Sequence, residues 1–124
     1  MASFVDVHRA VRAAIEMHHA FDGLREHNPD ARRTSLKVGA HGGPCYAITA
    51  NGVLDCFGQS VNVAARLQGQ AGAGEVVTEA HLADEAAAQG WVSTDRIHDR
   101  FTARLKGVPE PVAAARIRVD DRAR

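Results

Sequence analysis

The sequence predicts an α+β fold in which helices pack on a largely antiparallel sheet. Segments with helical and strand-like patterns alternate along the chain, which is typical of this class. The order includes at least one hairpin, in which Gly42-Gly43-Pro44 joins two strand-like segments, and Asn51-Gly52 is a strong turn signal. The length of 124 residues suits one domain with a modest core.

The first predicted element is a long amphipathic helix. From Asp6 to about Arg25, apolar side chains recur at helical spacing. This stripe consists of Val7, Val11, Ala14, Ile15, His18, Phe21 and Leu24. Asp6 or Ser3 can cap the helix, and Asn28-Pro29-Asp30 ends it and opens a polar loop.

Two strands are expected after this loop. Leu36–Ala40 has the pattern of a strand, Gly42-Gly43-Pro44 turns the chain, and Cys45–Ala50 returns as a second strand. Asn51-Gly52 then leads into a short strand end or loop that contains Asp55.

The stretch Leu54–Leu67 is predicted to pass from this loop, through a pivot at Gly58, into a helix capped by Ser60. The side chains expected to face the core are Val61, Ala64 and Ala65. Asn62 and Arg66 fall on another face, one turn apart, where both can contact one ligand.

Asp55, Asn62 and Arg66 together suit a sugar-phosphate ligand. A guanidinium can bind phosphate oxygens in bidentate fashion, and a helix N-terminus favours negative charge. The alternative is that Asn62 and Arg66 are simply the solvated face of an amphipathic helix.

The C-terminal half continues the alternation. The expected elements are a strand at Glu75–Thr78, a helix from a Thr78 cap to about Gln89, a strand at Asp99–Leu105 and a final strand at Val112–Val119. Gly90 ends the helix, and Trp91–Thr94 is either a short strand or a connection. Residues 120–124 form a charged tail that we expect to fray.

Composition excludes several classes of function. Fifteen Lys and Arg balance fifteen Asp and Glu, so no basic field or set of surface aromatics favours nucleic acid or an RNA-binding module. No apolar run is long enough to span a bilayer and no signal peptide precedes the first helix, so we expect a cytoplasmic protein. Cys45 and Cys56 are too few for a disulfide framework or zinc site, and we expect small buried thiols.

Metal sites are not expected from the histidines. Glu16-x-x-His19 matches half of a di-iron helix motif, but the second half is missing, so we expect both side chains to be solvated. His18 is expected to pack on the apolar side of its helix. His41 lies at a strand end near the presumed cleft, where it could contact a ligand, but we expect a satisfied structural histidine.

The stretch Leu54–Leu67 resembles the signature of the class III adenylate and guanylate cyclases, which is aromatic-Asp-x-aromatic-Gly-x-x-Val-Asn-x-Ala-x-Arg. Three other segments resemble further blocks of that family: Leu36–Pro44, Gly74–Val77 and Leu105-Lys106-Gly107. The resemblance implies a ferredoxin-like sheet. It also implies that residues 1–119 are a partial nucleotide cyclase-like domain, about the last two-thirds of a family domain.

The resemblance assigns roles to four residues. In the family, the ribose 3′-hydroxyl attacks the α-phosphate of ATP or GTP, and a cyclic nucleotide and pyrophosphate are formed. Arg66 would stabilise the phosphoryl charge and Asn62 would orient the ribose. Asp55 would accept a hydrogen bond from the adenine amino group, which favours ATP, and Lys106 would contact the terminal phosphates.

The departures from the family are equally informative. Its two metal-binding aspartates, which hold Mg or Mn, lie in upstream patterns that this sequence lacks, and no residue precedes Met1 to supply them. We therefore expect a domain truncated at its N-terminus and inactive alone. A lost first strand would leave an open sheet edge, which favours a homodimer or a swapped assembly. The alternative is a non-catalytic nucleotide-binding or dimerisation module derived from the same fold.

Overall fold

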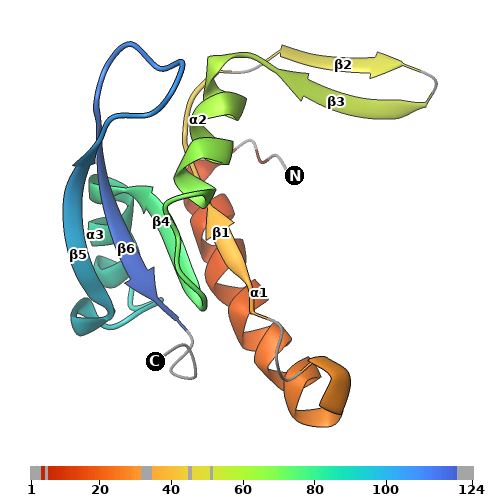
Figure 1. The fold of residues 1–124 in the computed structure, drawn as a ribbon, viewed down its shortest axis with the longest axis vertical. Coiled ribbons are helices and arrows are strands. Elements are labelled where there is room, and N and C mark those ends of the chain that lie inside the picture. Colours follow the sequence, from red (N-terminus) through yellow and green to blue (C-terminus); the bar gives the residue numbers. More distant parts are fainter. Residues whose placement is uncertain (1–3, 5, 32–34, 45, 51, 120–124) are drawn as a thin grey trace.

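The computed structural model describes residues 4, 6–31, 35–44, 46–50 and 52–119. Its elements in chain order are α1 (Val7–His27), the 3-10 turn η1 (Pro29–Ala31), β1 (Lys37–Gly39), β2 (Tyr46–Ala50), β3 (Val53–Phe57), α2 (Gln59–Gln68), β4 (Glu75–Glu79), α3 (Ala80–Ala88), the 3-10 turn η2 (Thr94–Arg96), β5 (Ile97–Ala103) and β6 (Val112–Arg118). The chain is thus the mixed α+β fold that the sequence predicts (Figure 1).

The strands form a four-stranded sheet and a separate hairpin. The sheet has the order β1-β4-β6-β5, in which β1 and β4 are parallel and the other two pairs are antiparallel. The hairpin of β2 and β3 extends away from the sheet, at the end where α2 begins (Figure 1).

The pairing expected between the first two strands is wrong. Gly42-Gly43-Pro44 does not fold β2 back on β1, because β1 pairs with β4 and β2 pairs with β3. The turn that makes the hairpin is the one at Asn51-Gly52, where Gly52 has a φ of 76° and Ala50 pairs with Val53. A two-residue turn of this kind fixes its neighbours in register, and residue 51 itself lies outside the described part of the chain.

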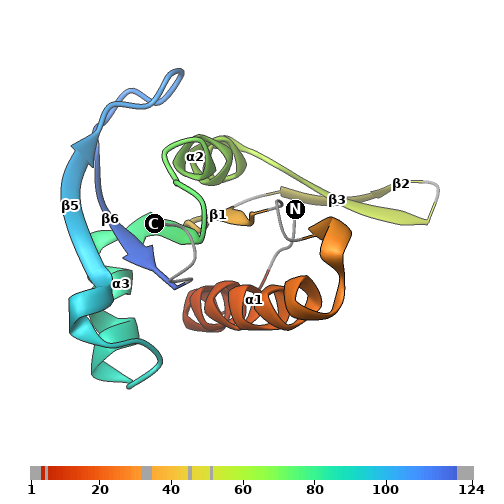
Figure 2. The same cartoon turned by 60° about the horizontal axis from the view of Figure 1, so that its bottom comes forward.

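Helices cover both faces of the sheet, with α2 on one face and α1 and α3 on the other (Figure 2). Alternation along β4 explains this arrangement, because Val77 packs with α2 whereas Val76 packs with α1 and α3. The core on the α2 side contains Val63, Leu67, Ala71, Val77, Ala103, Leu105 and Ala114. The other side contains Val11, Ala14, Ile15, Ala40, Val76, Leu82, Ala83, Ala86, Ala115 and Ile117.

The prediction for α1 is largely confirmed. Asp6 is its N-cap, and the Asp6 carboxylate accepts a hydrogen bond from His8 N at 2.9 Å. Of the predicted stripe, Val11, Ala14, Ile15 and His18 are buried. Leu24 is instead 53% exposed, and Arg25 is buried near that end of the helix.

Two predicted helix caps are wrong. Helix α2 begins two residues earlier than expected and takes Gly58, with a φ of 128°, as its N-cap, so Ser60 lies inside the helix. Thr78 is fully buried in β4, and Glu79 occupies the N-cap position of α3. In both places the strand runs to the helix, which leaves the expected cap residue inside an element. Gly90 does end α3 in the left-handed conformation, with a φ of 78°.

The other elements predicted for the C-terminal half are present, with bounds that differ slightly from those predicted. Trp91–Thr94 is a connection and leads into η2, and β5 begins at Ile97, two residues earlier than expected. The predicted tail of residues 120–124 and the thiol of Cys45 lie outside the described residues, and nothing is described of the Cys56 side chain.

Candidate functional site

The candidate site is centred on the solvent-facing side of α2. Val63 and Leu67 are 4% and 0% exposed and anchor this helix to the sheet. The prediction that Val61, Ala64 and Ala65 face the core is therefore wrong, since Val61 and Ala64 are only half-buried and Ala65 is exposed. Val63 and Leu67 offer more apolar surface than the two alanines, and the helix turns that pair toward the sheet.

Asn62 and Arg66 both lie on the exposed part of α2. They are one helical turn apart, as predicted, so the carboxamide and the guanidinium project on the same side of the helix. This arrangement is compatible with a shared ligand. It is equally compatible with the solvated-face alternative stated above.

A turn from the C-terminal half lies beside the start of α2. The Gln59 side-chain Nε2 donates a hydrogen bond to Gly107 O at 2.9 Å, although the two residues are 48 positions apart in the sequence. Lys106, which immediately precedes Gly107, is exposed. Leu105 is 6% exposed and packs in the same core cluster as Val63. The structure therefore brings the Lys106 turn and the helix of Asn62 together.

Asp55 lies in the strand β3, not in a loop as the sequence suggested. Its backbone pairs with Ile48 of β2, and the strand ends at Phe57, directly before the Gly58 N-cap. The Asp55 side chain is outside what the structure describes. Its direction relative to Asn62 and Arg66 thus stays a prediction.

The segment between β1 and β2 packs tightly against the first turn of α2. A Cβ added to Gly43 would overlap with Ser60 Oγ and lie 3.2 Å from Ser60 Cβ. The preceding Gly42 donates its N–H to Glu79 Oε1 at 3.1 Å, and His41 Nδ1 lies 2.6 Å from the same oxygen. The His41 side chain is 16% exposed, so this histidine is largely buried, and its structural role stays a prediction.

The C-terminal end of α2 is held by an arginine of the sheet. Arg116 Nε donates to Gln70 O at 3.1 Å, in the loop just after the helix. The Arg116 guanidinium also pairs with Asp99 and lies 4.1 Å from the centre of the Phe101 ring. This set of contacts positions α2 from its far end.

A buried carboxylate lies beside this arginine. The Glu75 side chain is 7% exposed and accepts the Gly72 N–H at 2.7 Å. It pairs with His98 and lies 4.0 Å from nitrogens of both Arg116 and Arg118. The carboxylate is thus compensated by cationic and N–H groups, as a buried charge requires.

His18 is buried on the opposite face of the sheet, as predicted, with an exposure of 2%. Its Nε2 lies within hydrogen-bond distance, 3.1 Å, of the Glu75 carbonyl oxygen. His19 and Glu16 are exposed, again as predicted, and Glu16 pairs with Arg12 at 3.2 Å.

The described residues do not fit a metal ion. Among them, no group of three or more His, Cys, Asp or Glu side chains is arranged to hold one. Glu75, the most deeply buried of the acidic side chains discussed above, is already paired with cationic groups.

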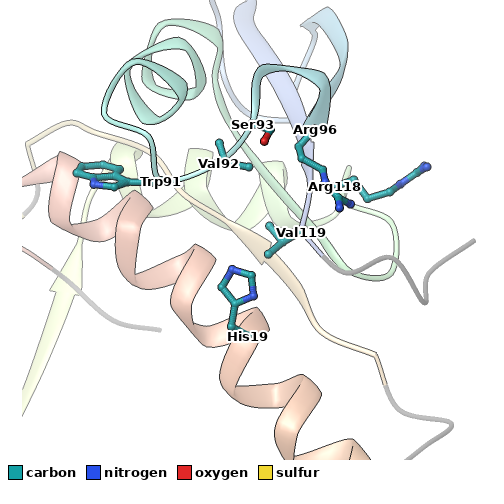
Figure 3. Close-up of a pocket in the computed structure, with 7 residues that line it drawn as sticks. All are labelled: His19, Trp91, Val92, Ser93, Arg96, Arg118 and Val119. Atoms are coloured by element: carbon teal, nitrogen blue, oxygen red, sulfur yellow. The ribbon is translucent and has the colours of Figure 1, made fainter.

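A pocket with a volume of about 200 Å³ lies elsewhere, between α1, the connection after α3 and the end of β6 (Figure 3). It is lined by His19, Trp91, Val92, Ser93, Arg96, Arg118 and Val119. None of the predicted site residues contributes to it. Trp91, Val92 and Val119 also pack against the α1 and α3 core, so this pocket is on the other side of the sheet from α2.

Most of the chain matches the sequence model of a known protein family. A sequence model of the adenylate and guanylate cyclase catalytic domain covers residues 2–106. The chain belongs to this family. Residues 54–67, on which the resemblance chiefly rested, fall inside the matched range of this cyclase-family chain. No curated protein matches it by sequence.

Solved structures share the fold of the cyclase-family chain. The guanylyl cyclase Cya2 gives a TM-score of 0.67 at 20% identity, covering 94% of this chain and 60% of that one. An adenylate/guanylate cyclase/hydrolase from Silicibacter pomeroyi gives a TM-score of 0.64 at 24% sequence identity, and the match covers 95% of this chain and 65% of that one. The adenylyl cyclase CyaB from P. aeruginosa gives a TM-score of 0.61 at 20% sequence identity, and the match covers 96% of this chain and 62% of that one. The cyclase-family chain therefore spans less than two thirds of each of these three relatives.

Two contacts of the candidate site had no signal in the sequence of the cyclase-family chain. The Gln59–Gly107 hydrogen bond and the Glu79–His41 ion pair both join segments far apart in the chain. Within the described part of the chain, no helix is both long enough and apolar enough to cross a bilayer.

Proposed function

We propose that this chain is the portion of an adenylate cyclase-type catalytic domain, a lyase, that holds the ribose and phosphates of ATP. Residues 1–119 would form that portion. The observation that carries the proposal is the exposed side of α2, where Asn62 and Arg66 lie one turn apart, together with the Gln59–Gly107 hydrogen bond that places the Lys106 turn at the same helix.

Each of these side chains has a role suited to its chemistry. The Arg66 guanidinium would stabilise the charge that develops on the phosphoryl oxygens as the ribose 3′-hydroxyl attacks the α-phosphate. The Asn62 carboxamide would orient the ribose, and the Lys106 ammonium would bind the terminal phosphates. Asp55 would accept a hydrogen bond from the adenine amino group, which favours ATP over GTP.

The family reaction uses Mg²⁺ or Mn²⁺ to activate the nucleophile and hold the triphosphate. The family's two patterns for metal-binding aspartates are absent from the 124 residues. We therefore propose that these residues by themselves bind ATP but convert little or none of it to cyclic AMP and pyrophosphate.

A fluorescent ATP analogue tests the binding role. Arg66→Ala should weaken binding about 10- to 100-fold, because a hydrogen bond to a charged group contributes about 1.5–3 kcal/mol. Arg9→Ala is the matched control, since Arg9 is an exposed arginine on α1, on the far side of the sheet. Equal binding by the two variants would favour the solvated-face reading of α2.

The second candidate is a non-catalytic nucleotide-binding or dimerisation module, which the absent aspartate patterns favour. Titrating the chain with ATP, with and without Mn²⁺, separates the two candidates. Binding that strengthens with Mn²⁺ supports the catalytic portion, whereas measurable cyclic AMP that Arg66→Ala abolishes would overturn the expectation that these residues convert little ATP. A metal-independent or absent response supports the module.

Self-association is part of the proposal, because the family's active sites lie between two domains. Two features of the described residues support a homodimer or swapped assembly. The strand β1 is at an edge of its sheet, with β4 as its partner. Met17 and Leu24 of α1 are 50% and 53% exposed. An open edge and exposed apolar side chains both favour a second chain. A monomeric mass in light scattering at micromolar concentration would contradict this part of the proposal.

A further inference from the structure

Glu79 connects three elements near the start of α2. It ends β4, its side chain is 19% exposed, and its Oε1 accepts the Gly42 N–H at 3.1 Å. His41 Nδ1 lies 2.6 Å from the same oxygen. The carboxylate thus holds two consecutive residues of the segment that leaves β1.

This carboxylate extends the pairing of the strands beyond their ends. The last backbone contact of this segment with β4 is the bond from Ala40 N to Val77 O at 2.9 Å. Two residues further along each strand, the Gly42 N–H is bonded by the Glu79 side chain instead of a backbone carbonyl. Glu79 therefore helps to fix the backbone position of the residues that follow β1.

The segment Gly42-Gly43 lies between the first turn of α1 and the first turn of α2. A Cβ on Gly42 would lie 2.7 Å from a methyl group of Val7, in the first turn of α1. A Cβ on Gly43 would overlap with Ser60 Oγ, in the first turn of α2. Gly42 and Gly43 carry no Cβ, which lets the segment pass this close to both helices, so we expect a displacement of the segment to disturb the side-chain packing at the start of α2.

Glu79 does not serve as a helix cap in the usual way. It occupies the N-cap position of α3, but its side chain makes no capping hydrogen bond there. Its second oxygen, Oε2, lies 3.7 Å from Nδ1 of His81, whose side chain is 65% exposed. The closer contacts of the carboxylate are those with His41 and Gly42.

We propose that Glu79, together with His41, is a positioning pair that fixes the first turn of α2 and hence the place of Asn62. The inference rests on the proposed function, because it assigns Glu79 to the arrangement of the nucleotide site. Glu79 does not contact the nucleotide in this proposal. It acts through the Gly42-Gly43 segment, whose contact with Ser60 sets the entry of the chain into the helix.

The test compares Glu79→Ala with Glu79→Gln, and uses His81→Ala as the control. Amide hydrogen exchange is measured at residues 42–43 and 59–62, and the affinity for a fluorescent ATP analogue is measured in parallel. Glu79→Ala should raise exchange at both segments about tenfold and weaken ATP binding by a similar factor, as loss of a charged hydrogen bond would. Glu79→Gln keeps an acceptor oxygen and should restore most of both, and His81→Ala should change neither.

Three outcomes decide the proposal. Unchanged exchange at residues 59–62 in Glu79→Ala would overturn it. A uniform rise across all amides, with no excess at the two segments, would also overturn it, because that result reports a loss of global stability alone. If the local excess is found but the wild-type chain binds no ATP analogue, the positioning role stands and the proposed function fails.

Discussion

At Gly39 the strand β1 and the helix α2 approach each other so closely that there is no room for a side chain. A Cβ built on Gly39 would lie 2.6 Å from Ala64 O and 2.7 Å from Gln68 Cα, and would overlap with Gln68 N. Carbon contacts become favourable at about 3.5 Å, so β1 and α2 would have to separate by about 1 Å to admit one methyl group. All three atoms belong to the helix backbone and cannot rotate aside.

We therefore expect Gly39→Ala to lower the free energy of unfolding by about 3 kcal/mol, at the upper end of the usual cost of overpacking a core. The midpoint of urea unfolding should fall while the slope with denaturant stays the same. The pairing of Gly39 with Val77 of β4 ties this position to the sheet, so a shift of β1 away from α2 would strain that pairing. Affinity for the ATP analogue should also fall, since α2 carries Asn62 and Arg66.

Gly23→Ala is the matched control for this substitution. Gly23 lies inside α1, and a Cβ added there meets nothing within 4 Å. Alanine should raise the free energy of unfolding by up to about 1 kcal/mol, because glycine loses more conformational entropy in a helix. The opposite signs of the two glycine substitutions are the result to check. If Gly39→Ala is as stable as the wild type, α2 does not cross β1 at the described distance.

Three further substitutions test single contacts. Thr78→Val should stabilise the chain by about 1 kcal/mol in thermal unfolding, because Thr78 Oγ1 is fully buried and has no hydrogen-bond partner among the described residues; a loss of stability would imply a partner for that hydroxyl. Glu75→Gln should lower the free energy of unfolding by about 1.5–3 kcal/mol, because it removes the charge from the buried acceptor of the Gly72 N–H; a neutral result would show that the charge of this carboxylate contributes nothing to stability. Asp6→Ala removes the acceptor of the His8 N–H and should cost about 1 kcal/mol, with faster amide exchange confined to the first turn of α1; unchanged exchange there would argue against the cap.

The sequence by itself determined the features that depend on neighbours along the chain. The limits of α1 follow from its apolar spacing, its Asp6 cap and the Asn28-Pro29-Asp30 stop. The turn at Asn51-Gly52 also follows from its two residues, although the pairing of the strands that it joins did not. The family could also be identified from the residues of one short stretch.

Tertiary structure decided what depends on distant partners. The parallel pairing of Gly39 with Val77 joins residues that no local pattern relates, and it displaced the expected hairpin. The apolar side chains of α2 allow more than one buried face, and contact with the sheet selected Val63 and Leu67. Long-range contacts also put Gln59 beside Gly107 and Glu79 beside His41. Local spacing fixes which side chains share one helix, but only packing fixes which other segments those side chains meet.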